Sequence, residues 1–218
     1  ASAAAAVVLL LTGGMTAVSV SKRLSQPTIV STQMGERSQV VLPDGSKVWL
    51  NSCSRVEYSA PLLSRERRVK MEGEAYFEVE HDRHAPFVVS TNGLNVRVLG
   101  TRFNIRNDDT NHRVTTVLLE GAVTADTREH RCAPIRLRPA QQLVYDTRKG
   151  EMRLTDCTSA EASINWIDGR LHFDRSTFAE IVAELKRYYN VDVHFTDASL
   201  RNERFSGCLL YTSPSPRD

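Results

Sequence analysis

The sequence has few of the features that metal, nucleotide or acyl-transfer chemistry requires. Only four of its 218 residues are cysteine (53, 132, 157 and 208), and no two of them stand in a C-x-x-C spacing. A zinc site is therefore not expected. An exported domain could use some of these cysteines in a structural disulfide, but the sequence does not say which pair would form. Gly73, Gly93, Gly100 and Gly121 occur singly, and the sequence has no Gly-rich phosphate loop. No serine stands in a nucleophile-elbow context.

The chain also lacks a charge excess of either sign. Twenty-eight Lys and Arg against 26 Asp and Glu give a net charge of +2 at pH 7, which is too small to indicate a nucleic-acid partner. The densest basic run, RERRVK at 65–70, alternates with apolar residues and contains a glutamate, so we interpret it as a solvated strand face. A hydrophobic content of 41% is ordinary for a globular protein.

One long uncharged run is present, at the N-terminus. Residues 1–21 (ASAAAAVVLLLTGGMTAVSVS) carry no charge, and Lys22 and Arg23 end the run. About 20 apolar residues span a bilayer, so we predict a transmembrane helix over 1–21, followed by a polar linker over 22–33. The alternative is a secretory signal, because the most apolar stretch, 3–11, has the length of a signal's apolar region. Either interpretation makes the rest of the chain an exported protein, and the absence of an initial Met leads us to expect sequence upstream.

From residue 34 to 156 the hydrophobic pattern has a period of two, which is typical of half-buried strands. SQVVLPDGSKVWLN predicts a hairpin around Pro43-Asp44-Gly45. KMEGEAYFEVE (70–80) alternates apolar with polar residues, which predicts one strand with a solvated face made of Glu72, Glu74, Tyr76, Glu78 and Glu80. Further strands are expected at 86–90, 94–100, 102–106, 113–125, 135–139, 141–146 and 151–155. Many short strands indicate an all-β domain, and the pattern leaves a sandwich, a barrel and a solenoid-like antiparallel stack open.

The pattern changes after Cys157. A polar connector over 157–168 leads to GRLHF (169–173), which is expected to be a strand. TFAEIVAELKRYY predicts a helix, because Thr177 and Glu180 form a capping box. An apolar stripe follows one face of this helix: Phe178, Ile181, Val182, Leu185 and Tyr189. VDVHFTD (191–197) is expected to be a second strand and 204–207 the start of a third, so 169–207 is predicted to be a small, incomplete α+β module of β-α-β form.

The strongest candidates for catalysis are the carboxylates of 70–80. Four of them on one strand face could supply general acid and base groups. However, no aromatic platform for a glycan lies nearby, and a solvated face explains them better. His81 and His84 fall in an expected turn without further metal ligands beside them, so surface positions explain both. We therefore predict no catalytic, cofactor or metal residues and no enzymatic activity.

Several blocks of the sequence occur in a recognisable order: VLPDGSKVWLN (41–51), MEGEAYFEVEHD (71–82), PFVVST (86–91), VRVLGTRFNI (96–105), LLEGAV (118–123) and LRPAQQLVYD (137–146). Together they resemble the FecR family of transmembrane anti-sigma regulators. The last block has Ala140 where the family pattern L-x-P-G-Q-Q-x-x-Y has Gly. WIDGRLHFDRSTFAEIVAELKRYYNVDVHFTD (166–197) resembles the second periplasmic module of that family, related to the short N-terminal domain of secretins and TonB-dependent transporters. The likeness covers about 34–207, with 34–156 as the FecR-like β domain.

The resemblance implies a signalling protein rather than an enzyme. Such a protein would cross the inner membrane once, with most of the chain in the periplasm and with no cofactor. A cytoplasmic segment upstream would hold an extracytoplasmic-function (ECF) sigma factor. The periplasmic part would receive a signal from the signalling domain of a TonB-dependent outer-membrane transporter, and periplasmic proteases would take part in releasing the sigma factor.

For the partner surface we single out Arg170, His172 and Asp174, which point outward beside Leu171 and Phe173 on the strand at 169–173. An open sheet edge there would suit recognition by strand addition. The alternative function is a periplasmic carbohydrate-binding or carbohydrate-active β protein, based on the acidic strand face. A fragment of secretin-like outer-membrane machinery would explain the β-α-β unit but not the β domain before it.

The last eleven residues, CLLYTSPSPRD (208–218), differ from the alternating pattern before them. One string of codons for these residues matches a transposase library adapter read from its end. We therefore expect 208–218 to be translated sequencing adapter and the module to be truncated after Gly207. The alternative is a genuine disordered Ser-Pro tail.

Overall fold

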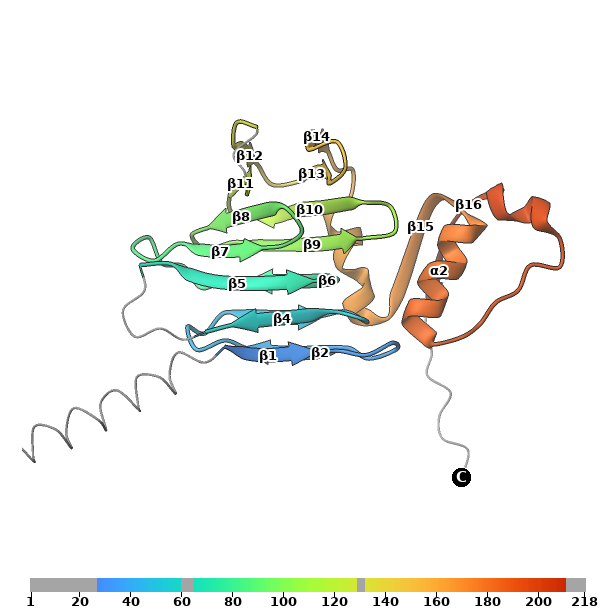
Figure 1. The fold of residues 1–218 in the computed structure, drawn as a ribbon, viewed down its shortest axis with the longest axis horizontal. Coiled ribbons are helices and arrows are strands. Elements are labelled where there is room, and N and C mark those ends of the chain that lie inside the picture. Colours follow the sequence, from blue (N-terminus) through green and yellow to red (C-terminus); the bar gives the residue numbers. More distant parts are fainter. Residues whose placement is uncertain (1–26, 60–64, 129–131, 211–218) are drawn as a thin grey trace, which may run out of the picture.

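A computed structural model describes residues 27–59, 65–128 and 132–210, and two seven-stranded sheets dominate it (Figure 1). Sheet A consists, in spatial order, of β1 (Thr28–Ser31), β4 (Arg55–Tyr58), β5 (Arg67–Glu72), β7 (Phe87–Ser90), β8 (Leu94–Val98), β11 (Val123–Thr127) and β12 (Ile135–Leu137). Sheet B consists of β14 (Glu151–Asp156), β13 (Gln141–Asp146), β10 (Arg113–Glu120), β9 (Arg102–Asp108), β6 (Glu74–Glu78), β3 (Lys47–Leu50) and β2 (Ser38–Val41). Neighbouring strands are antiparallel, except that β5 and β7 run parallel.

The chain builds these sheets by alternating between them. The β2–β3 hairpin lies in sheet B, β4 and β5 in sheet A, β6 in sheet B, and the hairpins β7–β8, β9–β10, β11–β12 and β13–β14 continue the alternation. Each new segment therefore pairs with the strand that an earlier segment left at the edge of the same sheet. The domain is a sandwich, one of the architectures that the sequence left open, and its hairpins advance along it in a solenoid-like way.

One apolar core joins the two sheets. Phe77 of β6 stacks on Phe103 of β9, with ring centroids 5.1 Å apart, and meets Phe87 of β7 in the opposite sheet edge to face at 6.3 Å. All three side chains are buried, as are most inward-facing residues of both sheets. Burying each such side chain contributes roughly 1.5–3 kcal/mol. This core explains the period-two pattern from which the strands were predicted.

Two glycines break segments that the sequence predicted as single strands. The segment 70–80 turns at Gly73 (φ +79°), with β5 in sheet A and β6 in sheet B. The segment 113–125 turns at Gly121 (φ +92°), from β10 in sheet B to β11 in sheet A. A side chain at such a positive φ costs about 1–2 kcal/mol, which favours glycine. Both glycines are therefore corners at which the chain changes sheets.

Of the other predictions for the sandwich, one is confirmed and one is partly wrong. The hairpin at Gly45 (φ +87°) is confirmed as β2–β3. The linker expected over 22–33 is wrong for its second half, because residues 28–31 form β1 and pair with β4. Ala140, which replaces the family's glycine, has a positive φ of +62°. The predicted transmembrane helix at 1–21 lies outside the described residues, and within the described ranges no helix is both long and apolar enough to cross a membrane.

The C-terminal module, residues 160–210, comprises a 3₁₀ helix η1 (Ala160–Asp168), β15 (Arg170–Thr177), α2 (Phe178–Tyr189), a 3₁₀ helix η2 (Ala198–Asn202) and β16 (Arg204–Leu210). The predicted helix is confirmed with its capping box: Glu180 N–H donates to Thr177 Oγ1 at 3.2 Å, and Thr177 N–H donates to Glu180 Oε2 at 2.8 Å. Asn190 ends α2 at φ +52°.

The strand predicted at 191–197 does not form. Val191 and Val193 are 42% and 41% exposed, and the module's sheet contains only β15 and β16, which are antiparallel. An alternating pattern makes a strand only where a neighbour supplies ladder hydrogen bonds. β16 runs on through Cys208 to Leu210, but backbone groups of any sequence can make such a ladder. The proposal that 208–218 is adapter sequence therefore stays a prediction.

Candidate functional site, a docked C-terminal module

Figure 1 shows the C-terminal module beside the sandwich. The module packs against the outer side of sheet B through a second apolar cluster. Tyr76 of β6 and, beside it, Trp49 of β3 supply the sandwich side, with their ring centroids 5.2 Å apart. The module contributes Trp166, Leu171, Phe173, Ile181 and Tyr188, all buried. We call these contacts, together with the polar contacts described next, the docking interface.

This packing corrects the prediction of a solvated face on 70–80. Glu74 is only 4% exposed and Tyr76 only 2%, because the module covers them. Glu72 and Glu80, by contrast, are exposed as predicted. The carboxylates that looked alike in sequence therefore occupy different environments, and Glu74 is the buried one.

The Glu74 carboxylate joins the sandwich to α2. Its Oε1 accepts a hydrogen bond from Asn104 Nδ2 of β9 at 3.1 Å, and its Oε2 accepts one from Asn51 Nδ2 at 2.9 Å. Arg187 of α2 donates from Nη2 to the same Oε2 at 2.7 Å. Charge-assisted hydrogen bonds of this kind are about twice as strong as neutral ones. Residues distant in the sequence thus meet at one buried carboxylate.

Three more side chains belong to the polar part of the docking interface. Asn51 Nδ2 also donates to the Tyr188 hydroxyl at 2.6 Å, and Arg106 of β9 forms an ion pair with Glu184 of α2. Burial disfavours the charged form of Arg106, but the carboxylates of Glu74 and Glu184 outweigh it and raise the pKa of Arg106. The charges of two carboxylates and two guanidiniums therefore balance where α2 contacts the sandwich.

The segment between β1 and β2 adds further contacts with the module. The Gly35 N–H donates to the Arg187 carbonyl at 3.1 Å. Arg37 Nη1 donates to the carbonyl of Trp166 and, at 3.5 Å, to that of Ile167. The N-terminal part of the sandwich therefore contacts both η1 and α2.

The three residues predicted for partner binding lie together on β15. Arg170, His172 and Asp174 are exposed, whereas Leu171 and Phe173 between them are buried in the docking interface. Arg170 forms an ion pair with Asp168 at 2.9 Å, and Asp174 Oδ1 accepts from Ser206 Oγ at 3.4 Å. The predicted outward orientation is confirmed, and a role in binding stays a prediction.

Sequence reasoning missed the docking residues Asn51, Glu74, Asn104 and Arg187. One signal was available, since Asn104 stands between Phe103 and Ile105 in the strand expected at 102–106, whose other residues are apolar or basic. A buried amide needs hydrogen-bond partners, so such a residue marks a polar contact on the outer side of a strand. Its partners could not be named without the fold.

Metal and disulfide chemistry find no support in the part of the chain that the structure describes. It contains no group of three or more His, Cys, Asp or Glu that could hold a metal ion. Its four cysteines are free thiols. His84, one of the paired histidines considered above, is fully exposed.

The buried hydroxyl of Tyr188 makes docking sensitive to alkaline pH. Burial, and then the charge of Glu74, raise the pKa of Tyr188 well above its ordinary value, so the folded chain keeps a proton that the unfolded chain loses above about pH 10. This contribution to stability is fully present below pH 10 and is lost as the pH rises further. Burial also raises the pKa of Tyr76 to about 12. The contribution of Tyr76 to stability is therefore also lost as the pH rises above about 10.

We therefore expect Tyr188→Phe to reduce the loss of stability between about pH 9 and 11. The measurement is the urea midpoint of the wild type and the variant across this range. Tyr58→Phe, at a half-exposed tyrosine of β4, is the matched control. Identical pH profiles for the wild type and Tyr188→Phe would contradict the expectation.

Two family models match the chain, one on each part. The model described as "FecR protein" matches residues 28–124, and the model described as "FecR, C-terminal" matches 170–213. The chain is also similar to two crystal structures of a candidate anti-sigma factor from Parabacteroides distasonis ATCC 8503. In the first, the identity is 31% and the TM-score 0.76, over 85% of this chain and 86% of that one. In the second, the identity is 31% and the TM-score 0.73, over 86% of each. Among proteins of curated function, none matches this chain.

Proposed function

This chain belongs to the FecR family, and from that premise we propose that it is an anti-sigma factor that transduces a signal by way of its docked C-terminal module. The observation that carries the proposal is the two-part architecture. A β15 strand that faces outward on one side is anchored on its other side to the sandwich. The likeness to the Parabacteroides protein, over most of both chains, supports the same role.

The finer proposal concerns location and partners. The chain would cross the inner membrane once, through residues 1–21, and place the sandwich and the module in the periplasm. A segment ahead of Ala1 would bind an ECF sigma factor in the cytoplasm. The signal would come from the signalling domain of a TonB-dependent outer-membrane transporter, and periplasmic proteases would act after it arrives. The uncharged run at 1–21 and the family membership support this arrangement.

On this proposal β15 is the receiving element. Its exposed side carries Arg170, His172 and Asp174, and among the described strands it pairs with β16 alone. A partner strand could add to the module's sheet through backbone hydrogen bonds. Leu171 and Phe173 on the same strand belong to the docking interface. Binding to β15 would therefore shift the equilibrium between the docked and the released module.

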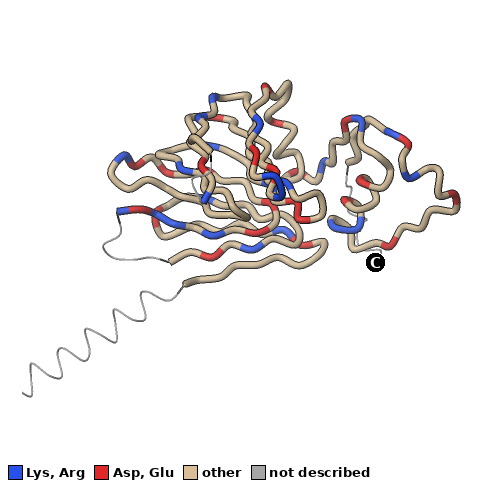
Figure 2. Tube along the Cα trace, turned by 45° about the horizontal axis from the view of Figure 1, so that its top comes forward, with Lys and Arg blue, Asp and Glu red and all other residues tan. Residues whose placement is uncertain are grey.

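The alternative of a carbohydrate-active protein loses its main support. It rested on four carboxylates on one solvated face, and Glu74 proves to be buried and fully engaged in the docking interface. Members of this family regulate rather than catalyse. Figure 2 shows acidic and basic positions interspersed along the strands of the sandwich, which is not the single-sign stripe of a nucleic-acid-binding surface.

The test is transcription from a promoter that depends on the ECF sigma factor, with the transporter's substrate added. We expect that transcription no longer changes on addition of the substrate when this gene is deleted, and that the wild-type gene restores the change. A triple alanine variant at Arg170, His172 and Asp174 should accumulate normally and fail to restore it. The matched control is Glu151→Ala with Arg153→Ala, two exposed positions on β14. A response that survives the deletion would refute the proposed function.

A further inference from the structure

The segment 191–197, between α2 and η2, has the sequence pattern of a strand but no strand beside it. Apolar residues alternate with polar ones in VDVHF (191–195), and valine and phenylalanine are common in strands. Among the described residues, no backbone hydrogen bond engages 191–196. The N–H and C=O groups of this segment are therefore available to a strand that another molecule supplies.

The segment is also accessible. Figure 1 shows it on the side of the module that faces away from the sandwich. Val191 and Val193 are 42% and 41% exposed, and Asp192 and His194 are exposed as well. No residue of 191–197 belongs to the apolar cluster of the docking interface. A partner could therefore pair with this segment while the module stays docked on the sandwich.

The sequence VDVHF is self-complementary when two copies of it pair in antiparallel order about Val193. In that register Asp192 of each copy lies opposite His194 of the other, on one side of the strand pair. On the other side, Val193 lies opposite Val193, and Val191 lies opposite Phe195. Acidic–basic pairs and pairs of an aromatic with a β-branched residue both stabilise antiparallel strands.

The neighbouring symmetric registers match these side chains less well. Opposed side chains in a sheet point to the same side, so a symmetric antiparallel pair must be centred on a residue. A pair centred on Asp192 would bring two carboxylates together at the symmetry axis. A pair centred on His194 would bring two imidazoles together and leave Asp192 opposite Thr196. The charges therefore favour the register centred on Val193.

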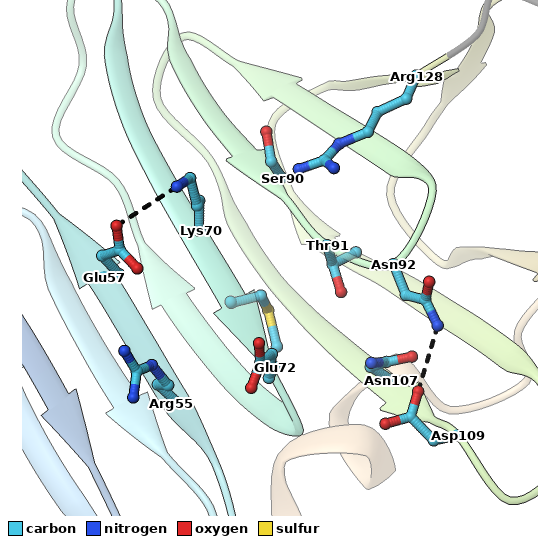
Figure 3. A pocket seen from close by; sticks show the side chains of 11 residues that line it. Arg55, Glu57, Lys70, Glu72, Ser90, Thr91, Asn92, Asn107, Asp109 and Arg128 are labelled. Carbon is cyan, nitrogen blue, oxygen red and sulfur yellow. Dashed lines mark hydrogen bonds and ion pairs between the residues drawn. The ribbon is translucent and has the colours of Figure 1, made fainter.

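Sheet A already contains cross-strand pairs of unlike charge. In the antiparallel pair of β4 and β5, Arg55 lies opposite Glu72, and Glu57 lies opposite Lys70. Figure 3 shows these four side chains on neighbouring strands. The Lys70 ammonium lies 3.4 Å from the Glu57 carboxylate. Acidic and basic side chains thus face each other across adjacent strands elsewhere in this protein.

We propose that 191–197 pairs with the same segment of a second copy of this chain, in antiparallel order about a two-fold axis at Val193. Two-fold symmetric dimers are the commonest homo-oligomers. Asp192 forms an ion pair with Lys186 of its own copy at 2.6 Å, yet its side chain is 71% exposed, so it remains accessible to His194 of the other copy. The contact does not involve β15, and the inference does not rest on the proposed signalling function.

The test is sedimentation velocity of the full chain in mild detergent, at protein concentrations between about 10 and 300 µM. A contact of this size is weak, so we expect a reversible dimer with a Kd of about 100 µM or tighter. Val193→Asp places two carboxylates at the symmetry axis and should raise the Kd at least about tenfold. Val41→Asp, at a 59% exposed valine of β2, is the matched control and should leave the Kd unchanged.

An exchange of charges tests the register. Asp192→Lys places a cation opposite His194, and His194→Glu places a carboxylate opposite Asp192, so each variant alone should raise the Kd about tenfold. In an equimolar mixture of the two variants, the introduced lysine faces the introduced glutamate, and the remaining Asp192 faces the remaining His194. We therefore expect a heterodimer with about the wild-type Kd.

Three results would overturn the inference. In the first, the wild type stays monomeric up to about 300 µM, which would leave 191–197 to a different partner or to a further part of its own chain. In the second, Val193→Asp dimerises as tightly as the wild type, which would place the contact elsewhere. In the third, either charge variant dimerises like the wild type, or their mixture forms no heterodimer.

Discussion

Glu74→Ala is expected to release the C-terminal module and to lower the free energy of unfolding by about 3–5 kcal/mol, the usual cost of removing one partner from a buried ion pair. The alanine would leave Arg187, whose side chain is only 19% exposed, without its carboxylate. It would also remove the acceptor for Asn104 and one acceptor for Asn51. The measurements are urea unfolding of the full chain and limited proteolysis of the segment 157–168.

Glu72→Ala is the matched control for this prediction. Glu72 lies two residues away on the other side of Gly73, is exposed, and makes no ion pair with a described residue. We expect a change within about 0.5 kcal/mol and no new proteolysis. Arg187→Met should make the module equally sensitive to protease, and the double variant should show strong coupling between the two positions. A loss below about 1 kcal/mol for Glu74→Ala would contradict the role assigned to this carboxylate.

Gly73→Ala is expected to have the second large effect. An alanine Cβ at this position would lie 2.5 Å from Ser54 Oγ, 2.6 Å from the Cys53 carbonyl oxygen and 2.8 Å from Ser54 Cα. Two of these atoms belong to the backbone, so they cannot move aside cheaply. The positive φ costs about 1–2 kcal/mol and the crowding about 1–3 kcal/mol. The total expected loss is about 2–5 kcal/mol, with the corner between the two sheets displaced.

Gly150→Ala separates the two causes. Gly150 has nearly the same φ, +72°, but no atom lies within 4 Å of the position that an alanine Cβ would take, so only the backbone cost of about 1–2 kcal/mol applies. Urea unfolding of the two variants under the same conditions gives the comparison. Equal losses for Gly73→Ala and Gly150→Ala would mean that the crowding at Ser54 does not matter.

The strand pattern predicted the fold class but hid one of the two corners. Met71 before Gly73 and Phe77 after it both face the core, so the alternation keeps its phase across the corner and looks like one strand. At Gly121 the phase does change, because Leu118 and Val123 face the core at an odd spacing. That change of phase was a signal for the second corner. At Gly73 only tertiary packing could reveal the turn.

The candidate site was predictable only in part. Period two placed Arg170, His172 and Asp174 on the exposed side of β15 correctly, because the neighbouring Leu171 and Phe173 are buried. The burial of Glu74 could not be predicted in this way, since it depends on a helix more than a hundred residues further along the chain. The strand predicted at 191–197 failed for a related reason, because local alternation does not say whether a neighbouring strand exists.

We propose that β15 receives the signal while the docking interface holds it to the sandwich. Hydrogen–deuterium exchange of the full chain tests this proposal, measured with and without the signalling domain of the TonB-dependent transporter that we propose as its partner. We expect protection of the amides at 170–174 when the domain binds, and changed exchange at Gly35, whose N–H donates to the Arg187 carbonyl. Protection confined to sheet A, or no binding of that domain, would contradict it.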